Sequence, residues 1–421
     1  MPAPKAETIQ TEVCIVGAGP AGSAASLTLS KKGIPHLVVD AEVFPRNKPC
    51  GDILTTGVLR ALNQIDPEIL MEMKQKGLLN PIWHTLTYPP NGKPISIDFL
   101  PFDGKEGEPG CFSVSRREMD MLLVNKLLAS GFADFRQGFR VTSLKKTKPG
   151  FELCSDSGEM IRTKLLIIAT GSGNSLLKQL GLEIPKSESA IGIRGHFEGL
   201  DWNLQETGLF LHPDIMPGGL YVTPLPDGTC NVNLVMSLNK VSDAGISLRE
   251  RFDSVVKSID ILNCKFSNAK RIGNFEGSML FLGTKRRIVA GDSYMVAGDS
   301  AGLIEFFSGN GIPQAITSGR IAGETAISAI ENQNFSAGFL SDYENKLYQK
   351  IKLNYAGGRI VLPLLHKPYY SKLVLKFLNF LSGRPQTNAM LRDLLYEKNP
   401  GKILRKPGFY YKLLFKREPV S

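Results

Sequence analysis

A short stretch near the start of the chain limits its fold more than any other feature of the sequence. Residues 12–16 are apolar and typical of a buried strand, and a G-x-G-x-x-G run occupies 17–22 directly after them. A helical pattern follows at 23–32, and a second apolar strand at 36–39 leads into Asp40. This order of strand, glycine turn, helix, strand and acid is the fingerprint of a Rossmann βαβ unit that binds a dinucleotide.

Each residue of this fingerprint has a physical role. Gly17 permits the tight turn, Gly19 lets the backbone approach a pyrophosphate, and Gly22 allows the helix to pack closely on the strand. The unpaired N–H groups at the start of the helix then face the phosphates. Asp40, 18 residues after Gly22, is placed to accept hydrogen bonds from ribose hydroxyls.

Two later segments again place glycine directly after a buried strand. Residues 165–171 are apolar and end in glycine, and the strand predicted at 294–297 runs into a glycine and then Asp299. A glycine-rich turn at 308–313 opens a helix that we expect at 314–330. A carboxylate after a strand can hold ribityl or ribose hydroxyls, and N–H groups at a helix start can stabilise the negative charge of a reduced flavin. These features are compatible with FAD as the dinucleotide.

Several motifs occur in order along the chain and carry a resemblance to a known family. They are the glycine fingerprint with Asp40, FPRNKPCGD at 44–52, RREMD at 116–120, ATG at 169–171 and GD at 298–299. With them the chain resembles, over about residues 10–345, the FAD-dependent oxidoreductases of the aromatic-hydroxylase superfamily. The K-x-C-G segment is most similar to the geranylgeranyl reductases, including their archaeal lipid and menaquinone-chain relatives.

The resemblance implies which residues contact FAD. Carried over by motif, the contacts fall on Gly22, Asp40, Cys50, Gly51, Arg116, Asp299, Gly311 and Ile312. In addition, Arg46 is a cation available to the pyrophosphate, and Arg116 is available to a phosphate or to the reduced flavin. The alternative for Arg116 is a surface ion pair with Glu118 or Asp120. Cys50 either lines the flavin pocket or is a small buried hydrophobe, and no base near it in sequence marks it as a nucleophile.

Departures from the family concern the pocket over the flavin. Thr170 stands where the hydroxylases place an aspartate, and the acidic Glu305 lacks the proline that follows it in the reductases. The reductase segment Y-x-W-x-F-P becomes YVTPLP at 221–226, and the two tryptophans that flavin halogenases need there are absent. The sequence identifies no catalytic residue. We expect the pocket wall to include Tyr221, Thr223, Phe306 and Phe307, with ordinary core packing as the alternative for the two phenylalanines.

The motifs divide the chain into three parts. We expect a discontinuous, Rossmann-like FAD-binding domain at 10–82, 116–184 and 286–345. Residues 83–115 and 185–285 are predicted as strands separated by turn signals, and they would form an antiparallel substrate sheet over the flavin. A helical C-terminal region at 346–421 would cover one end. The predicted fold class is therefore α/β with a second, antiparallel β-sheet domain.

The C-terminal region carries the whole positive excess of the chain. The net charge is +10, and residues 346–421 hold 16 basic and 3 acidic residues. Large aliphatic and aromatic residues are interleaved with these cations, for example at 373–381 and 409–417. This combination favours an anionic membrane surface over nucleic acid as a partner. The alternative is a helical cap packed on the core with a solvated basic face.

Cysteine usage and hydropathy bear on the compartment. The six cysteines are scattered with no C-x-x-C pair, which disfavours a disulfide framework and a zinc site and suits a reducing cytoplasm. No apolar run approaches the ~20 residues needed to span a bilayer, and the polar start of the chain does not resemble a signal peptide. We expect a cytoplasmic protein without a metal, attached peripherally to the inner face of the membrane if the C-terminal region binds lipid.

Three classes of function are compatible with these features. The first is an FAD-dependent oxidoreductase that reduces C=C bonds of a hydrophobic polyprenyl or lipid-linked substrate. Its electrons would come from NAD(P)H or a protein donor, because no second glycine fingerprint is present. The second is an FAD-dependent monooxygenase, a hydroxylase or epoxidase, acting on a hydrophobic or carrier-bound small molecule. The third, a non-enzymatic flavin-binding or nucleic-acid-binding protein, is disfavoured by the number of flavin motifs. The sequence favours the first.

Overall fold

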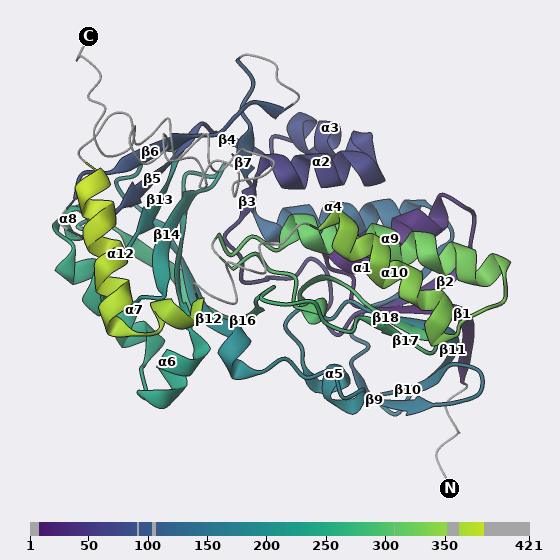
Figure 1. The fold of residues 1–421 in the computed structure, drawn as a ribbon. Coiled ribbons are helices and arrows are strands. Elements are labelled where there is room, and N and C mark those ends of the chain that lie inside the picture. Colours follow the sequence, from purple (N-terminus) through teal and green to yellow (C-terminus); the bar gives the residue numbers. More distant parts are fainter. Residues whose placement is uncertain (1–7, 91, 103–106, 307, 352–361, 383–421) are drawn as a thin grey trace, which may run out of the picture.

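Two large sheets dominate the structure, a computed structural model that describes residues 8–90, 92–102, 107–306, 308–351 and 362–382. One sheet has eight strands, the other has seven, and a three-stranded sheet lies beside them. In Figure 1 the eight-stranded sheet is at the right with helices α1 (Pro20–Ser30), α9 (Ile312–Glu331) and α10 (Ala337–Lys350). The seven-stranded sheet is at the left, near α12 (Pro368–Leu381).

The eight-stranded sheet is built around the glycine fingerprint. Its spatial order is β17-β18-β11-β1-β2-β8, with β10 and then β9 continuing from β11. The strands are β1 (Ile9–Val16), β2 (His36–Val39), β8 (Ala133–Arg136), β9 (Val141–Lys146), β10 (Phe151–Ser155), β11 (Met160–Ile168), β17 (Ala290–Gly291) and β18 (Tyr294–Val296). The four strands predicted from apolar runs are neighbours, β18-β11-β1-β2, and each adjacent pair is parallel. Their carboxyl ends therefore meet at one edge of the sheet.

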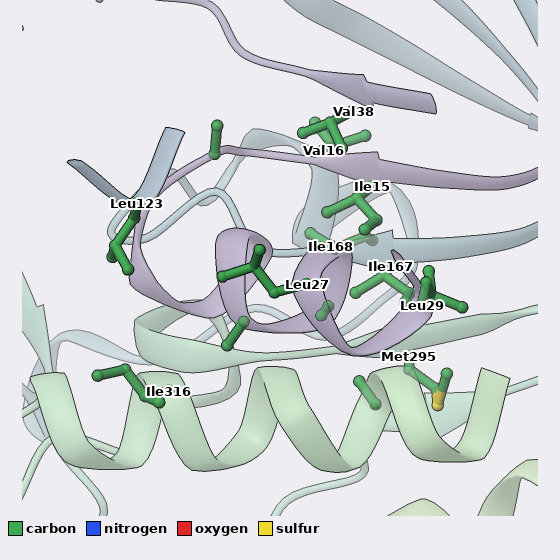
Figure 2. Packing of buried hydrophobic residues seen from close by; sticks show 14 of the residues in the cluster. Ile15, Val16, Leu27, Leu29, Val38, Leu123, Ile167, Ile168, Met295 and Ile316 are labelled. Atoms are coloured by element: carbon green, nitrogen blue, oxygen red, sulfur yellow. The ribbon is translucent and has the colours of Figure 1, made fainter. Parts of the chain in front are cut away.

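Helices α1 and α9 pack on each other and on this sheet. A Cβ at Gly319 of α9 would lie 2.0 Å from the carbonyl oxygen of Ala21 in α1, so glycine permits the close approach. Figure 2 shows the apolar side chains that fill the layers between the strands and α9, among them Leu27, Ile167 and Ile316. Helix α4 (Arg116–Ala129) also contributes buried side chains to this core.

The seven-stranded sheet is drawn from two separated segments of the chain. Its spatial order is β16-β12-β15-β14-β13-β5-β6. The strands are β5 (His84–Tyr88), β6 (Ile95–Asp98), β12 (Ser189–Glu198), β13 (Glu206–Phe210), β14 (Gly218–Pro224), β15 (Cys230–Ser237) and β16 (Lys270–Phe281). Neighbouring strands are antiparallel except β13 and β5, which are parallel. The predicted α/β class with a second sheet is confirmed, apart from this one parallel pair, whereas the exact domain boundaries stay a prediction.

Part of the second segment is helical, which corrects the prediction of strands throughout 185–285. Residues 238–265 contain α6 (Leu238–Asp243), α7 (Leu248–Ser258) and α8 (Asp260–Lys265). Ser247 caps α7 by accepting a hydrogen bond from the Glu250 amide at 3.3 Å. Phe252 of α7 then stacks on Phe197 of β12, with ring centroids 5.9 Å apart. Side chains alternate between the two faces of a strand, so Arg194 and His196 point to the face opposite Phe197. Helix α7 covers the face of Phe197 and does not cover the face of Arg194 and His196.

The remaining elements link the two sheets and cover one side of the molecule. The three-stranded sheet has the order β3-β7-β4, with β3 (Ile53–Leu54), β4 (Asn80–Ile82) and β7 (Cys111–Ser113), and the other helices are α2 (Thr56–Ile65), α3 (Pro67–Gln75) and α5 (Ser175–Gln179). In the predicted C-terminal region the structure describes 346–351 and 362–382, and the rest of that region lies outside the described residues. His366, just before α12, lies 2.6 Å from the Ser237 hydroxyl of β15, which ties α12 to the seven-stranded sheet. Among the described helices, none is long and apolar enough to cross a bilayer.

Candidate functional site

A cavity of about 1120 Å³ lies between the two large sheets. It is bordered by the carboxyl ends of the parallel strands, by the starts of α1 and α9, and by one face of the seven-stranded sheet. Open α/β sheets bind their ligands at such strand ends. Twelve of the residues predicted from the sequence lie on its wall, namely Gly17, Gly19, Asp40, Arg46, Cys50, Gly51, Arg116, Tyr221, Thr223, Asp299, Gly311 and Ile312.

The glycine loop at one end of the cavity is packed so closely at two positions, Gly17 and Gly22, that a side chain is excluded there. A Cβ at Gly22 would lie 1.7 Å from the Gly17 carbonyl oxygen, and a Cβ at Gly17, where φ is +106°, would lie 2.3 Å from the Ala169 carbonyl oxygen. The Asp40 carboxylate holds the loop by accepting a hydrogen bond from the Ala18 amide at 2.7 Å. Gly22 is not itself on the cavity wall, and its role is to let α1 approach the loop.

Three largely buried cations, Arg46, Lys48 and Arg116, lie on the wall beside this loop. Arg116 donates two hydrogen bonds to Asp120, at 2.8 and 2.9 Å, and Arg46 lies 3.2 Å from the same carboxylate. Burial disfavours the charge on Arg116, but the contacts with Asp120 and Cys50 together outweigh this effect and raise the pKa of the guanidinium. The Arg116–Asp120 pair considered from the sequence therefore exists, but it is buried at the cavity rather than on the surface. Nη1 of Arg46 is buried and has no partner among the described atoms, so it is available to an anion.

Asp299 and the start of α9 form another part of the wall. Burial raises the pKa of Asp299, and the positive charge of Lys48 opposes that rise. Burial likewise lowers the pKa of Lys48, and Asp299 opposes that change, so the two groups favour each other's charged form. Gly311 precedes Ile312, the first residue of α9, and a Cβ at Gly311 would lie 3.0 Å from Oδ1 of Asp299. The free N–H groups of this helix start can bind negative charge.

The loop from Cys50 to Asp52 joins the two large sheets through hydrogen bonds. Asn231 of β15 donates to the Cys50 carbonyl oxygen at 2.8 Å and to the Asp52 carboxylate at 2.5 Å. Arg194 of β12 lies 3.5 Å from the same carboxylate and 2.6 Å from Glu276. Burial raises the pKa of Asp52 to about 7, although Arg194 favours its charged form. Cys50 is half-buried on the cavity wall, as expected for a pocket-lining residue.

The seven-stranded sheet presents polar groups to the cavity. On β14, Tyr221 and Thr223 pair with Asn233 and Asn231 of β15, respectively. Thr223 is 1% exposed, and its hydroxyl has no hydrogen-bond partner among the described atoms. Burial raises the pKa of Tyr221 to about 12, so its phenol keeps its proton at neutral pH. Apolar side chains share this part of the wall with them, among them Ile97, Phe99, Leu209, Val235 and Leu280.

Of the two phenylalanines predicted for the pocket wall, one is described by the structure, and it does not line the cavity. Phe306 is absent from the cavity wall and packs against the buried cluster around Ile304, which is the core packing considered as the alternative. Phe307 lies outside the described residues. The Glu305 amide donates to the Asn310 carbonyl oxygen at 3.1 Å, closing a turn that brings the following residues, not Phe306, to the cavity.

The sequence did not reveal the roles of Lys48, Asp52, Arg194, Asn231 and Asn233. Lys48 and Asp52 lie within the motif at 44–52, but the sequence of that motif does not show which of its residues line the cavity and which are buried behind it. In β15 the two asparagines alternate with the buried apolar residues 230, 232 and 234, and this alternation is a signal for a buried polar face. Arg194 carries no such signal, because its place depends on the register of β12 with β15.

The residues of the cavity fit an FAD. Gly17 and Gly22 have no room for a Cβ, and a Cβ at Gly19, which lies on the cavity wall, would meet only Nη2 of Arg46, at 3.5 Å. The backbone of Gly19 therefore lies at the cavity without a side chain over it, as a pyrophosphate requires. An unpartnered guanidinium nitrogen of Arg46 lies on the same wall. Asp40 and Asp299 stand at separate places on the cavity wall, as ribose and ribityl hydroxyls require, and the start of α9 supplies free N–H groups for the flavin.

Comparisons with known proteins agree with this fit. Residues 10–206 match the family model described as FAD binding domain. The chain is 27% identical over 345 residues to a digeranylgeranylglycerophospholipid reductase of Methanococcus vannielii, which covers 80% of this chain and 82% of that relative. It is 26% identical over 323 residues to a menaquinone reductase of Mycobacterium tuberculosis, which covers 74% and 76% of the two chains.

The fold itself is found in a solved structure. A geranylgeranyl bacteriochlorophyll reductase-like protein from Thermoplasma acidophilum aligns with a TM-score of 0.78 at 19% identity, covering 94% of this chain and 99% of that one. This likeness concerns the fold. Together with the FAD-binding model and the named relatives, it confirms the predicted cofactor and the predicted resemblance.

Proposed function

We propose that this FAD-dependent oxidoreductase, which is similar to the geranylgeranyl reductases, reduces C=C bonds of a hydrophobic polyprenyl or lipid-linked substrate. The observation that carries the proposal is the shared cavity, whose wall combines the nucleotide loops with apolar side chains of the seven-stranded sheet. Its volume of about 1120 Å³ exceeds the ~300–1,000 Å³ of ordinary ligand pockets. A cofactor and an apolar substrate can therefore lie in it side by side. The relatives named above, a phospholipid reductase and a menaquinone reductase, support a lipid substrate.

In this proposal the cofactor is held mainly by backbone and by charged side chains. Gly19 and Arg46 hold the pyrophosphate, Asp40 the ribose and Asp299 the ribityl chain. Gly17 and Gly22 shape the loop, and Gly311 with Ile312 supplies the N–H groups of α9, while Cys50, Gly51 and Arg116 form the adjoining wall. When bound and reduced, FAD would supply the hydride to one carbon, and water or a nearby acid would supply the proton to the other. NAD(P)H or a protein donor provides the electrons.

The residues of the sheet then do the positioning. An unactivated alkene is a poor electrophile, so its rate depends on placement against the cofactor more than on acid–base power. The apolar side chains of the sheet face orient the hydrocarbon chain and exclude water. Tyr221 holds a proton at its phenol oxygen throughout the neutral range, because burial raises its pKa to about 12.

Anaerobic turnover followed by mass spectrometry tests the reaction. We would incubate the purified protein with lipid extract and a chemical or NAD(P)H reductant, with Gly22→Ala, which we expect to lose FAD, as the control. Reduction adds two hydrogen atoms per double bond to a polyprenyl species without oxygen. A product that gains one oxygen atom, and forms only in air, would instead identify the monooxygenase considered from the sequence and refute the reductase.

We propose further that the C-terminal region lies against an anionic membrane surface. Tyr369, Leu373 and Phe377 of α12 are 71%, 53% and 45% exposed. Lys372 and Lys376 occupy intervening positions on the same helix. Exposed apolar residues with adjacent cations are typical of a helix that rests in the headgroup region of a bilayer. This placement would suit a lipid-linked substrate.

Flotation with phosphatidylserine-containing vesicles tests the membrane contact. Removing the chain from residue 346 onward would cut α10, which ends at Lys350 with Leu347 buried, so surface variants are preferable. The double variant Leu373→Gln/Phe377→Gln is expected to float less than the parent protein. Leu128→Gln/Phe132→Gln, at positions of similar exposure away from α12, is the control. Equal flotation of all three proteins would remove the membrane proposal.

A further inference from the structure

Three threonines on neighbouring strands form a row on the cavity face of the seven-stranded sheet. This threonine row consists of Thr85 in β5, Thr207 in β13 and Thr223 in β14, and all three line the cavity. Thr85 pairs directly with Thr207, and Thr207 precedes Gly208, which pairs with Val222 beside Thr223. Thr207 and Thr223 are 3% and 1% exposed. Two members of the row are therefore shielded from bulk water, whereas Thr85 is half-buried.

The hydroxyl of Thr223 has no hydrogen-bond partner among the described atoms. Its cross-strand neighbour Asn231 is already engaged, because it donates to the Cys50 carbonyl oxygen and to the Asp52 carboxylate. The side-chain oxygen of Asn231 accepts from Asn233 at 2.8 Å. A buried hydroxyl without a partner destabilises a protein, so a group that enters the cavity is expected to complete this hydrogen bond.

The charges on this face do not favour an anion beside the row. Arg194, the cation of the neighbouring strand β12, lies 2.6 Å from Glu276 and 3.5 Å from Asp52, so its charge is already compensated. Burial and the nearby Arg194 lower the pKa of His196, which is neutral at neutral pH. Among the described residues of the cavity wall, the unpartnered buried guanidinium nitrogen belongs to Arg46, beside the glycine loop. A charged phosphate would therefore find no free counter-charge at the row, whereas an uncharged oxygen would find a donor.

We propose that the threonine row is the subsite for an uncharged oxygen group of the substrate, a hydroxyl, ether or carbonyl oxygen that accepts a hydrogen bond from Thr223. The inference rests on the proposed function in one respect, since it takes the rest of the substrate to be the apolar chain held on the same sheet face. Fixing the oxygen-bearing end of such a chain determines which of its double bonds lies near the cofactor. Thr223 is thus a specificity-determining residue.

Binding of three matched probes tests this subsite without requiring turnover. The probes are geranylgeraniol, the hydrocarbon in which hydrogen replaces its hydroxyl group, and geranylgeranyl diphosphate. Their dissociation constants are measured from the perturbation of the flavin absorbance in the FAD-loaded protein. We expect the parent protein and Thr223→Ser to bind the alcohol ~10-fold more tightly than the hydrocarbon, and Thr223→Val, which keeps the shape but loses the hydroxyl, to bind them equally.

The other outcomes separate the alternatives. Loss of FAD from Thr223→Val would assign the hydroxyl to the cofactor, and a diphosphate that binds most tightly would assign the row to a charged group, so either result overturns the proposal. If Thr223→Val bound the alcohol and the hydrocarbon more weakly by the same factor, Thr223 would have only a packing role, and this result would also overturn the proposal. An alcohol preference that depends on Thr223 would support the subsite even if the lipid-extract assay described above refuted alkene reduction.

Discussion

The two large sheets border one cavity but contribute to it in opposite ways. The eight-stranded sheet contributes the ends of its strands, where backbone groups of residues such as Gly17 and Gly298 meet the cavity. The seven-stranded sheet contributes its face, through side chains such as Tyr221, Thr223 and Asn233. Backbone binding depends on glycines at short, fixed spacing, whereas a binding face depends on the register of strands far apart in sequence. We therefore expect cofactor binding to depend on a few fixed positions in the part of the cavity formed by the eight-stranded sheet, the cofactor half, and we expect the side chains of the seven-stranded face to determine specificity.

The largest effect is expected from Gly22→Ala in the cofactor half. The new methyl group would lie 1.7 Å from the Gly17 carbonyl oxygen, so α1 must move away from the loop that faces the cofactor. We expect nearly complete loss of bound FAD and destabilisation of ~3 kcal/mol or more, as for other severe steric conflicts in a core. The flavin absorbance of the purified protein and its unfolding in urea measure the two effects.

Gly338→Ala is the matched control for that substitution. A Cβ at Gly338 in α10 meets no atom within 4 Å, so the variant should retain full flavin absorbance and be slightly more stable. If Gly22→Ala bound FAD as well as Gly338→Ala, the cofactor half would not depend on glycine geometry, and the contrast between the two sheets would fail.

The next largest effect is expected from Asp120→Ala, which tests charge rather than shape in the cofactor half. Asp120 is 1% exposed and pairs with both Arg116 and Arg46. Removing it leaves two largely buried cations without their carboxylate, which typically costs ~3–5 kcal/mol. Thermal unfolding of the FAD-loaded protein measures the loss. Asp134→Ala, which breaks an exposed pair with Arg136, should cost no more than ~1 kcal/mol, and equal losses for the two variants would contradict this assignment.

The contrast also explains what could be predicted from the sequence. The four parallel strands, the starts of α1 and α9, and the acids Asp40 and Asp299 follow from local patterns, because each is a short run of residues with a fixed physical task. Local patterns do not show which residues of the seven-stranded sheet lie on its cavity face. Arg194 enters the site because β12 pairs with β15 in one register, and α7 was missed because its amphipathic spacing lies inside a segment dominated by strand signals.

Phe306 shows the limit of reasoning from composition. An aromatic residue next to a glycine-rich turn suggests a pocket wall, but aromatic side chains also dominate cores. The structure places it with the cluster around Ile304. Which of the two applies depends on the direction of the turn, and that direction is fixed by the hydrogen bond between Glu305 and Asn310 rather than by the type of residue.

A third prediction concerns the pH dependence of stability at the junction of the two sheets. Asp52 has a pKa of about 7 in the folded protein because it is buried, against about 3.9 in an unfolded chain. The folded state therefore binds the proton of the Asp52 carboxyl group more tightly than the unfolded chain does. The stability that this difference adds to the folded state is complete below about pH 4 and is lost as the pH rises through 7. The stability of the parent protein relative to Asp52→Asn should fall by up to about 4 kcal/mol between about pH 4 and pH 8. Urea unfolding across this range measures it, and a difference that does not change with pH would refute the raised pKa.

The smallest effect is expected from Cys50→Ala, which separates a backbone role from a side-chain role within a single residue. The hydrogen bond that ties Cys50 to the seven-stranded sheet uses its carbonyl oxygen, which accepts from Asn231 at 2.8 Å and survives the substitution. The substitution removes the contact of the thiol with Arg116, but Arg116 keeps its two hydrogen bonds to Asp120. We therefore expect full FAD content and a rate of geranylgeraniol reduction within ~10-fold of the parent protein. Asn231→Ala, which deletes the donor to both Cys50 and Asp52, should destabilise the protein by ~1–3 kcal/mol. A far larger loss of rate in Cys50→Ala, with FAD content and stability unchanged, would show that the thiol itself takes part in the chemistry and that the cofactor half contributes more than backbone and charge.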